Sequence, residues 1–239
     1  ADRIRQRVHD PEVAEKLIPK DHGFGVQRVP LETHYFEAYN RNNVKLVDIS
    51  ETPISRITPA GIQTSAEQFD VDLIVYATGF DAVTGAFDHI DIEGVDGQKL
   101  FDKWADGPVT YLGTFISGFP NLIMVAGPQS ASSSSNFPRA IEVGVDWASE
   151  LLSHLHKQGC SRFEASAEAE EAWTNHVAEM YQMVLMRKAK GWFTGYNSNV
   201  AGHEEGRIRH FVYNGGAQKF TATLAEVRDD NYRGLSLEP

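Results

Sequence analysis

An unbroken apolar run lies in the stretch Asp72-Leu-Ile-Val-Tyr-Ala-Thr-Gly-Phe80, where four apolar residues precede a small-residue turn. A run of this length is typical of a strand that is buried on both faces of an α/β sheet. The carboxyl end of such a strand is the usual place for a ligand, and a Thr-Gly turn lets the backbone approach one closely. A core strand that ends in an ordinary turn is the alternative interpretation.

A second apolar run, Leu122-Ile-Met-Val-Ala126, ends in Gly127-Pro128 and predicts another buried strand. The polar stretch Ser130-Ala-Ser-Ser-Ser-Ser135 follows it, and Asn136-Phe-Pro138 then has the cap and early proline of a helix start. Four consecutive serines are common in linkers. Between a strand and a helix they indicate a turn that faces a ligand at the helix N-terminus.

Periodicity predicts the remaining elements. Residues 2–18 predict two short helices interrupted by Pro11, and helices are also predicted at about 137–156, at about 165–188 and after Gly215-Gly216. The helix from Phe137 places four apolar residues on one stripe with acids opposite, namely Ile141, Val145, Ala148 and Leu152. Short strands are predicted at 44–48, 54–57, 62–64 and 211–213.

Composition narrows the possible functions. The 239 residues are 41% apolar and 10% aromatic, which is enough for a buried core. The net charge of −11 argues against nucleic acid or an anionic membrane as the main partner, and a small-molecule site remains possible. One cysteine, Cys160, excludes an internal disulfide and favours a reducing, cytoplasmic location. His154 and His156 point to different sides of a helix, so no metal site is predicted.

A glycine-bearing loop near the start contains Gly23-x-Gly25-x-x-Arg28. It imitates a dinucleotide fingerprint, but no strand precedes it and no helical pattern follows it, so the match fails in its context. The remaining feature is Arg28, just before Pro30. Taken alone, such an arginine is typical of a solvated surface.

Several short motifs in a fixed order carry a family resemblance. They are Phe24-Gly-x-x-Arg28, Tyr35-Phe-Glu-x-Tyr-Asn-Arg-x-Asn-Val44, Ile57-Thr-Pro-x-Gly61, Ala77-Thr-Gly-Phe-Asp81, Tyr111-Leu-Gly113, Phe119-Pro-Asn121, Gly127-Pro128 and Trp192-x-x-Gly195. Together they resemble the C-terminal part of Baeyer-Villiger monooxygenases. The resemblance covers nearly the whole chain, from about Asp2 to Gly234.

The resemblance implies an α/β flavoprotein fold with two dinucleotide-binding domains, of which this chain would be the C-terminal part. Residues 1–80 would be the end of the NADP-binding domain with its linker. Residues 81–239 would be the second segment of the FAD-binding domain, including a C-terminal substrate and cofactor loop. The family's two glycine-rich fingerprints and its FxGxxxHxxxW signature are not in this sequence. We therefore expect a fragment that needs an N-terminal half, on the same or a separate chain, and that is inactive alone.

The activity implied is the insertion of one oxygen atom of O2 next to a ketone carbonyl, which gives an ester or lactone and uses NADPH and FAD. Arg28 matches the family's active-site arginine, a permanent positive charge suited to the negative charge that develops on the ketone adduct. Gln27 stands where relatives have a lysine that pairs with the 2′-phosphate of NADPH.

Other site residues follow from the same resemblance. Cofactor contacts are implied for Ala77, Thr78, Gly79, Asn136, the backbone N–H of Phe137, and Trp192. The substrate pocket would be lined by Ser132, Ser133, Ser134 and Trp192, with serines where relatives have larger apolar residues. Two alternatives stay open: a flavin monooxygenase that oxygenates nitrogen or sulfur, which Arg28 argues against, and a non-catalytic interaction domain.

Overall fold

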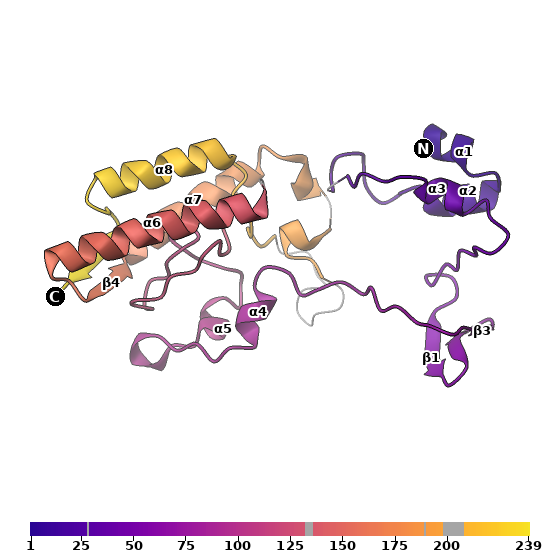
Figure 1. Ribbon diagram of the computed structural model, residues 1–239, viewed down its shortest axis with the longest axis horizontal. Coiled ribbons are helices and arrows are strands. Elements are labelled where there is room, and N and C mark those ends of the chain that lie inside the picture. Colours follow the sequence, from indigo (N-terminus) through magenta and orange to yellow (C-terminus); the bar gives the residue numbers. More distant parts are fainter. Residues whose placement is uncertain (28, 132–135, 189, 198–207) are drawn as a thin grey trace. The chain divides into compact units, whose positions relative to one another are not determined.

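The computed structural model describes residues 1–27, 29–131, 136–188, 190–197 and 208–239 (Figure 1). The chain divides into two compact units, Ala1–Gly79 and Phe80–Pro239. Helices and strands occur in both units, so the α/β class predicted from the sequence is confirmed. Among the described residues, no helix is both long and apolar enough to cross a lipid bilayer.

The first unit begins with three short helices, α1 (Asp2–Arg7), α2 (Pro11–Leu17) and α3 (Tyr35–Ala38). The predicted break between two helical pieces is confirmed. Pro11 occupies the first position of α2, where its missing N–H costs nothing, and the Asp10 carboxylate accepts from the N–H groups of Glu12 and Val13.

A three-stranded antiparallel sheet follows, β1 (Ile54–Thr58), β2 (Gly61–Thr64) and β3 (Gln68–Asp70), in the order β1-β2-β3. The strands predicted at 54–57 and 62–64 are confirmed, whereas β3 was not predicted. The strand predicted at 44–48 is wrong, because that segment pairs with no strand among the described residues. Gly61 has φ +153, and a Cβ there would lie 2.0 Å from the carbonyl oxygen of Phe69, so the turn requires glycine.

The buried strand predicted at 72–76 is also wrong for this structure. The segment forms no strand, and the side chains of Leu73, Val75 and Tyr76 are 77%, 76% and 69% exposed. A strand needs a neighbour for its main-chain N–H and C=O groups, and no described residue of this unit supplies one. The apolar side chains of 72–76 therefore form a surface that no described residue of this unit covers.

The second unit contains most of the helical residues. Its elements are α4 (Gly85–Asp88), η1 (Val95–Gly97), α5 (Leu100–Lys103), α6 (Phe137–Gln158), β4 (Arg162–Ala165), α7 (Ala167–Tyr181), η3 (Leu185–Lys188), η4 (Trp192–Thr194), α8 (Ala217–Asp229) and β5 (Leu235–Glu238). The helices α6 and α8 lie side by side, and β4 pairs antiparallel with β5 (Figure 1).

The predicted helices of this unit are confirmed, although α7 ends at Tyr181 and a 3-10 turn follows it. The strands predicted at 122–126 and 211–213 are wrong, because both segments run irregularly. Single backbone bonds replace a ladder there: Met124 donates to Thr114 O, and Tyr213 donates to Ser130 O. The β4–β5 pair was not predicted.

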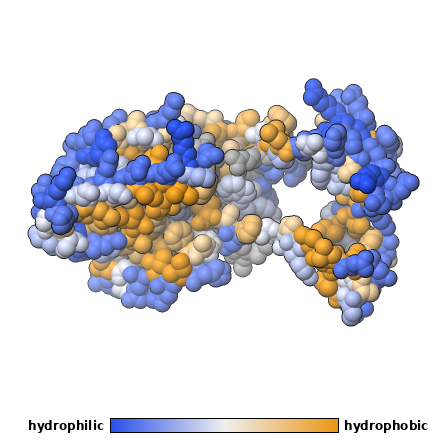
Figure 2. Space-filling model, in the orientation of Figure 1, coloured by the Kyte–Doolittle hydropathy of each residue, from blue (hydrophilic) through white to orange (hydrophobic). Residues whose placement is uncertain are grey.

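Helix α6 is apolar on two faces. Trp147, Leu151 and Leu155 are buried against α7 and α8 in the main core. Of the predicted stripe only Ala148 is buried, while Ile141, Val145 and Leu152 are exposed. Figure 2 shows apolar residues along the outer face of this helix. A helix that is apolar on both sides is typical of a layer that is packed on both sides.

A buried ion pair joins α5 to α7. The Nζ of Lys103 lies 2.9 Å from the carboxylate of Glu170, a residue that is 7% exposed. Both partners also bind Ser117: Lys103 donates to its carbonyl oxygen, and Glu170 accepts from its N–H. Burial raises the pKa of the Glu170 carboxyl, and the bonds from Lys103 and Ser117 oppose that shift.

Removing one partner of this pair is expected to be costly. Lys103→Met should lower the free energy of unfolding by about 3 kcal/mol, because it leaves the Glu170 carboxylate buried without its cation. Urea unfolding at pH 7 measures the change. The control is Lys99→Met, because Lys99 pairs with Asp91 and Glu93 at the surface and should contribute less than about 1 kcal/mol. Equal losses in the two variants would contradict the structural role of the buried pair.

Candidate functional site

The N-terminus of α6 is the first component of the site. Asn136 caps it: its side-chain oxygen accepts from Arg139 N at 3.3 Å, and its carbonyl accepts from Ala140 N at 3.0 Å. Pro138 has no N–H. Among the described residues, the N–H of Phe137 has no partner, so it is a donor available to a ligand at the positive end of a 22-residue helix.

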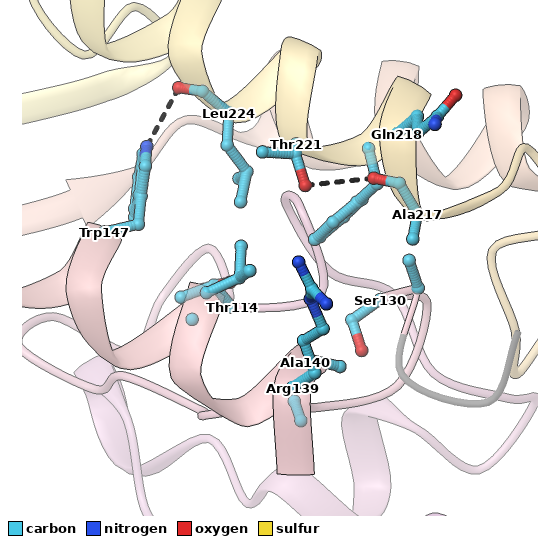
Figure 3. A pocket seen from close by; sticks show the side chains of 14 residues that line it. Thr114, Ser130, Arg139, Ala140, Trp147, Ala217, Gln218, Thr221 and Leu224 are labelled. Atoms are coloured by element: carbon cyan, nitrogen blue, oxygen red, sulfur yellow. Dashed lines mark hydrogen bonds between the residues drawn. The ribbon is translucent and has the colours of Figure 1, made fainter. Parts of the chain in front are cut away.

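A cavity of about 550 Å3 opens beside this helix start, between α6 and α8 (Figure 3). Its volume depends on small side chains at facing positions, including Ala140, Gly144 and Ala217. The lining residues are Thr114, Ala126, Ser130, Ala131, Arg139, Ala140, Val143, Gly144, Trp147, Ala217, Gln218, Phe220, Thr221 and Leu224. Ser130 and Ala131 directly precede residues 132–134, the serines that are predicted to line the substrate pocket.

The lining of the cavity is mostly apolar with a few polar groups. Trp147 and Thr221 have their polar atoms occupied: the indole N–H donates to Leu224 O at 2.9 Å, and the hydroxyl donates to Ala217 O at 3.0 Å. The side chain of Arg139 extends toward the space between the helices (Figure 3), and its guanidinium makes no ion pair with a described residue. Such a cavity suits an apolar molecule that bears one polar or anionic group.

The wall that contains Ser130 is fixed by the buried side chain of Gln129. Its carboxamide oxygen accepts from Thr110 Oγ1 at 2.8 Å and from Thr174 Oγ1 at 3.2 Å, and its Nε2 donates to Pro108 O at 2.8 Å. Gln129 has φ +66, a conformation that costs a non-glycine residue about 1 kcal/mol. These bonds hold it there.

Trp192 lies in η4 of the same unit, outside the lining of the cavity. Its side chain is 40% exposed and stacks on the buried ring of Phe193, with 3.8 Å between the ring centroids. The backbone before it is extended, and Gly195 ends the turn with φ +76. The indole is therefore presented outward on an anchored turn.

The other predicted site residues have different outcomes. Arg28, Ser132, Ser133 and Ser134 lie outside the described residues. Gln27 is exposed, and so are Ala77, Thr78 and Gly79 in the first unit. Gly79 has φ +89 with no atom near the position of a Cβ, which leaves room for a close backbone approach.

Asn136 and Phe137 lie at the start of α6, next to the cavity. Arg139 and Ala140, one turn further along the helix, line it. Sequence reasoning missed Arg139, Trp147 and the α8 residues of the cavity. The available signal was the set of small residues on one face of α6, at Ala140 and Gly144, four residues apart.

Known proteins resemble this chain over nearly its whole length. No family model matches it. It is 43% identical to a 2-oxo-Δ3-4,5,5-trimethylcyclopentenylacetyl-CoA monooxygenase of Pseudomonas putida, over 99% of this chain and 43% of that protein. It is 41% identical to cyclopentanone 1,2-monooxygenase of Comamonas sp., over 99% of this chain and 42% of that protein. A Baeyer-Villiger monooxygenase of Pseudooceanicola batsensis is 35% identical over 98% of this chain and 41% of its own length.

Two further comparisons bear on function. A phenazine N-monooxygenase of Lysobacter antibioticus is 39% identical over 98% of this chain and 42% of its own length. Among solved structures, OTEMO in complex with FAD and NADP matches with a TM-score of 0.89 and 43% identity, over 99% of this chain and 43% of that one.

The chain, whose structure is α/β, is therefore similar over nearly its whole length to part of several proteins that are named as monooxygenases. More specifically, it is homologous to part of the Baeyer-Villiger monooxygenases, and the resemblance inferred from the motifs is confirmed. It spans a little over two fifths of the length of the relatives described above.

Replacing Gly144, which lies in the cavity wall, tests how closely its neighbours pack. A Cβ at Gly144 would meet Val125 Cγ1 at 3.6 Å, an ordinary contact. Gly144→Ala should therefore raise the free energy of unfolding by about 1 kcal/mol, because glycine is unfavourable inside a helix. The matched variant is Gly113→Ala, where φ is +66 and a Cβ would lie 2.5 Å from Ser130 N. Urea unfolding should show opposite signs, and two losses would contradict the described cavity wall.

Proposed function

We propose that this chain is part of a flavin-dependent Baeyer-Villiger monooxygenase, which inserts one oxygen atom of O2 next to a ketone carbonyl and uses NADPH and FAD. The product is an ester or, from a cyclic ketone, a lactone. The observation that carries this proposal is the identity of 41–43% over 99% of the chain to a cyclopentanone monooxygenase and a cyclopentenylacetyl-CoA monooxygenase.

The residues present fit FAD at the start of α6. The N–H of Phe137, which has no partner among the described residues, the Asn136 cap and the helix dipole suit the electron-rich edge of a flavin ring. Thr78 and Gly79, where the backbone is open to close approach, are proposed as further contacts with Ala77. When bound, FAD supplies the activation of O2, with electrons from NADPH. Gln27, Arg28 and Trp192 are proposed as the contacts of NADP(H).

In this proposal Arg28 stabilises charge. The carbonyl oxygen of the ketone becomes negative when oxygen adds to the carbonyl carbon, and a guanidinium stays protonated throughout the working pH range. It can therefore stabilise that charge without taking part in proton transfer. Ser132, Ser133, Ser134 and Trp192 are proposed to line the ketone pocket. The cavity at Ser130 and Ala131 lies at the base of the same loop.

The two units are proposed to be parts of different domains. Residues 1–80 would end the NADP-binding domain, and 81–239 would form the second segment of the FAD-binding domain. The exposed run 72–76 and the outer face of α6 are apolar surfaces that need a covering layer. We propose that the N-terminal half of the enzyme covers both. The single Cys160, a free thiol, supports a cytoplasmic location.

Nitrogen oxygenation is the second candidate function, because the phenazine N-monooxygenase is 39% identical. Arg28 favours the ketone reaction, since a nitrogen nucleophile attacks oxygen without forming a tetrahedral oxyanion on carbon. Product analysis with a ketone and with an aromatic amine, in the enzyme that contains this chain, separates the two.

Loss of the guanidinium should stop oxygen transfer and spare cofactor reduction. In the complete enzyme, Arg28→Ala should leave NADPH consumption measurable and lower ester formation by about a hundredfold, the effect of losing about 3 kcal/mol of charge stabilisation. The electrons should then appear as hydrogen peroxide. Arg28→Lys, which keeps the charge, should retain part of the ester formation. Ester formation by Arg28→Ala near the parent rate would end this assignment.

Gln27 should weaken the choice between NADPH and NADH. A glutamine donates a hydrogen bond to the 2′-phosphate but brings no charge, and the difference is about 1 kcal/mol or more. Gln27→Lys should therefore raise the ratio of kcat/KM for NADPH to that for NADH by roughly tenfold. An unchanged ratio would show that another residue reads the phosphate. Gln27→Met is the control, and its ratio should not rise.

A further inference from the structure

The hydroxyl of Tyr181 lies at a crossing of two buried segments. It donates to the carbonyl oxygen of Phe193 at 2.5 Å and accepts from the N–H of Val212 at 3.2 Å. Tyr181, Phe193 and Val212 are all buried. Phe193 lies in η4 and Val212 in the irregular segment before α8, so one side chain joins two parts of the chain that are 19 residues apart in sequence.

The same irregular segment, residues 211–213, is bound to Gln129 and Ser130, which precede the predicted pocket serines 132–134. Gln129 N donates to Phe211 O at 2.7 Å, and Tyr213 N donates to Ser130 O at 3.2 Å. Tyr213 is fully buried and stacks on Trp173, whose indole N–H donates to Gln129 O at 3.3 Å. Residues 211–213 are thus bonded to Gln129 and Ser130 on one side and to Tyr181 on the other.

Two hydrogen bonds hold the turn that carries Trp192. One is the bond from Tyr181 to Phe193, the residue on which the Trp192 ring stacks. The other is the bond from Arg209 N to Thr194 O at 3.0 Å. The first depends on a side chain, so a single atom can be removed without changing the backbone.

We propose that Tyr181 is a positioning residue, whose hydroxyl sets the place of the Trp192 turn relative to the base of the loop at Gln129 and Ser130. The inference rests on the proposed function, in which Trp192 and that loop both face substrate. The group that connects the Trp192 turn to Gln129 and Ser130 is the Tyr181 hydroxyl. Without the hydroxyl, the bonds to Phe193 O and from Val212 N are lost, and the bond from Arg209 N to Thr194 O is left to tie the turn to the segment before α8.

The experiment compares Tyr181→Phe with Tyr111→Phe in the complete holoenzyme. Tyr111 is also buried and also donates one short bond to a backbone carbonyl, Arg233 O at 2.6 Å, so it controls for the general cost of losing such a bond. Tyr181→Phe should raise KM for the ketone about fivefold and raise the peroxide released per NADPH, with the rate of flavin reduction unchanged. Tyr111→Phe should move neither quantity.

A double-mutant cycle with Trp192→Ala tests the path of the effect. If Tyr181 acts through the turn, Tyr181→Phe should change nothing further in the Trp192→Ala background. Additive effects, or equal effects of Tyr181→Phe and Tyr111→Phe, would overturn the positioning role, and so would a silent Trp192→Ala. If Tyr181→Phe does not fold, 3-fluorotyrosine at position 181 is used instead: it keeps the hydroxyl that donates to Phe193 O and should therefore leave KM near the parent value, and a fivefold rise in KM would overturn the role. Absence of ester from the parent enzyme would instead refute the proposed function.

Discussion

The carboxamide of Gln129 is the constraint on which the second unit depends most. A buried amide must have its hydrogen bonds satisfied, and this one binds Pro108, Thr110 and Thr174 while its backbone binds Phe211. Those partners come from a loop, from helix α7 and from the irregular segment before α8. The residues that follow Gln129 lead into the serine loop and the start of α6. The place of the candidate site is therefore determined by buried polar geometry as much as by apolar packing.

Two apolar surfaces are left exposed by the described residues. The run 72–76 has the composition of a central strand and no neighbour, and α6 shows Ile141, Val145 and Leu152 to solvent. Both are understandable if the homologous enzymes, more than twice as long, place further layers against them. In the proposed function, the N-terminal half of the enzyme covers both surfaces.

Sequence patterns predicted the helices well, because helix starts depend on nearby residues such as Asp10, Pro11 and Asn136. They failed for strands at 44–48, 72–76, 122–126 and 211–213, because a strand depends on a pairing partner that the local sequence does not reveal, and none of these segments pairs in a ladder among the described residues. The family was found from the order of motifs. The cavity was not, because its lining combines residues of α6, such as Gly144, with residues of α8, such as Ala217, and only the packing of the two helices brings them together.

In the proposed function, this chain belongs to an enzyme that inserts oxygen beside a ketone carbonyl. The most direct measurement supplies the complete enzyme with FAD, NADPH, a cyclic ketone and 18O2, and analyses the product by mass spectrometry. The expected product is a lactone with one 18O atom at the ring position and an unlabelled carbonyl. An enzyme that yields only hydrogen peroxide with ketones, but an 18O-labelled N-oxide with an aromatic amine, would contradict the claim.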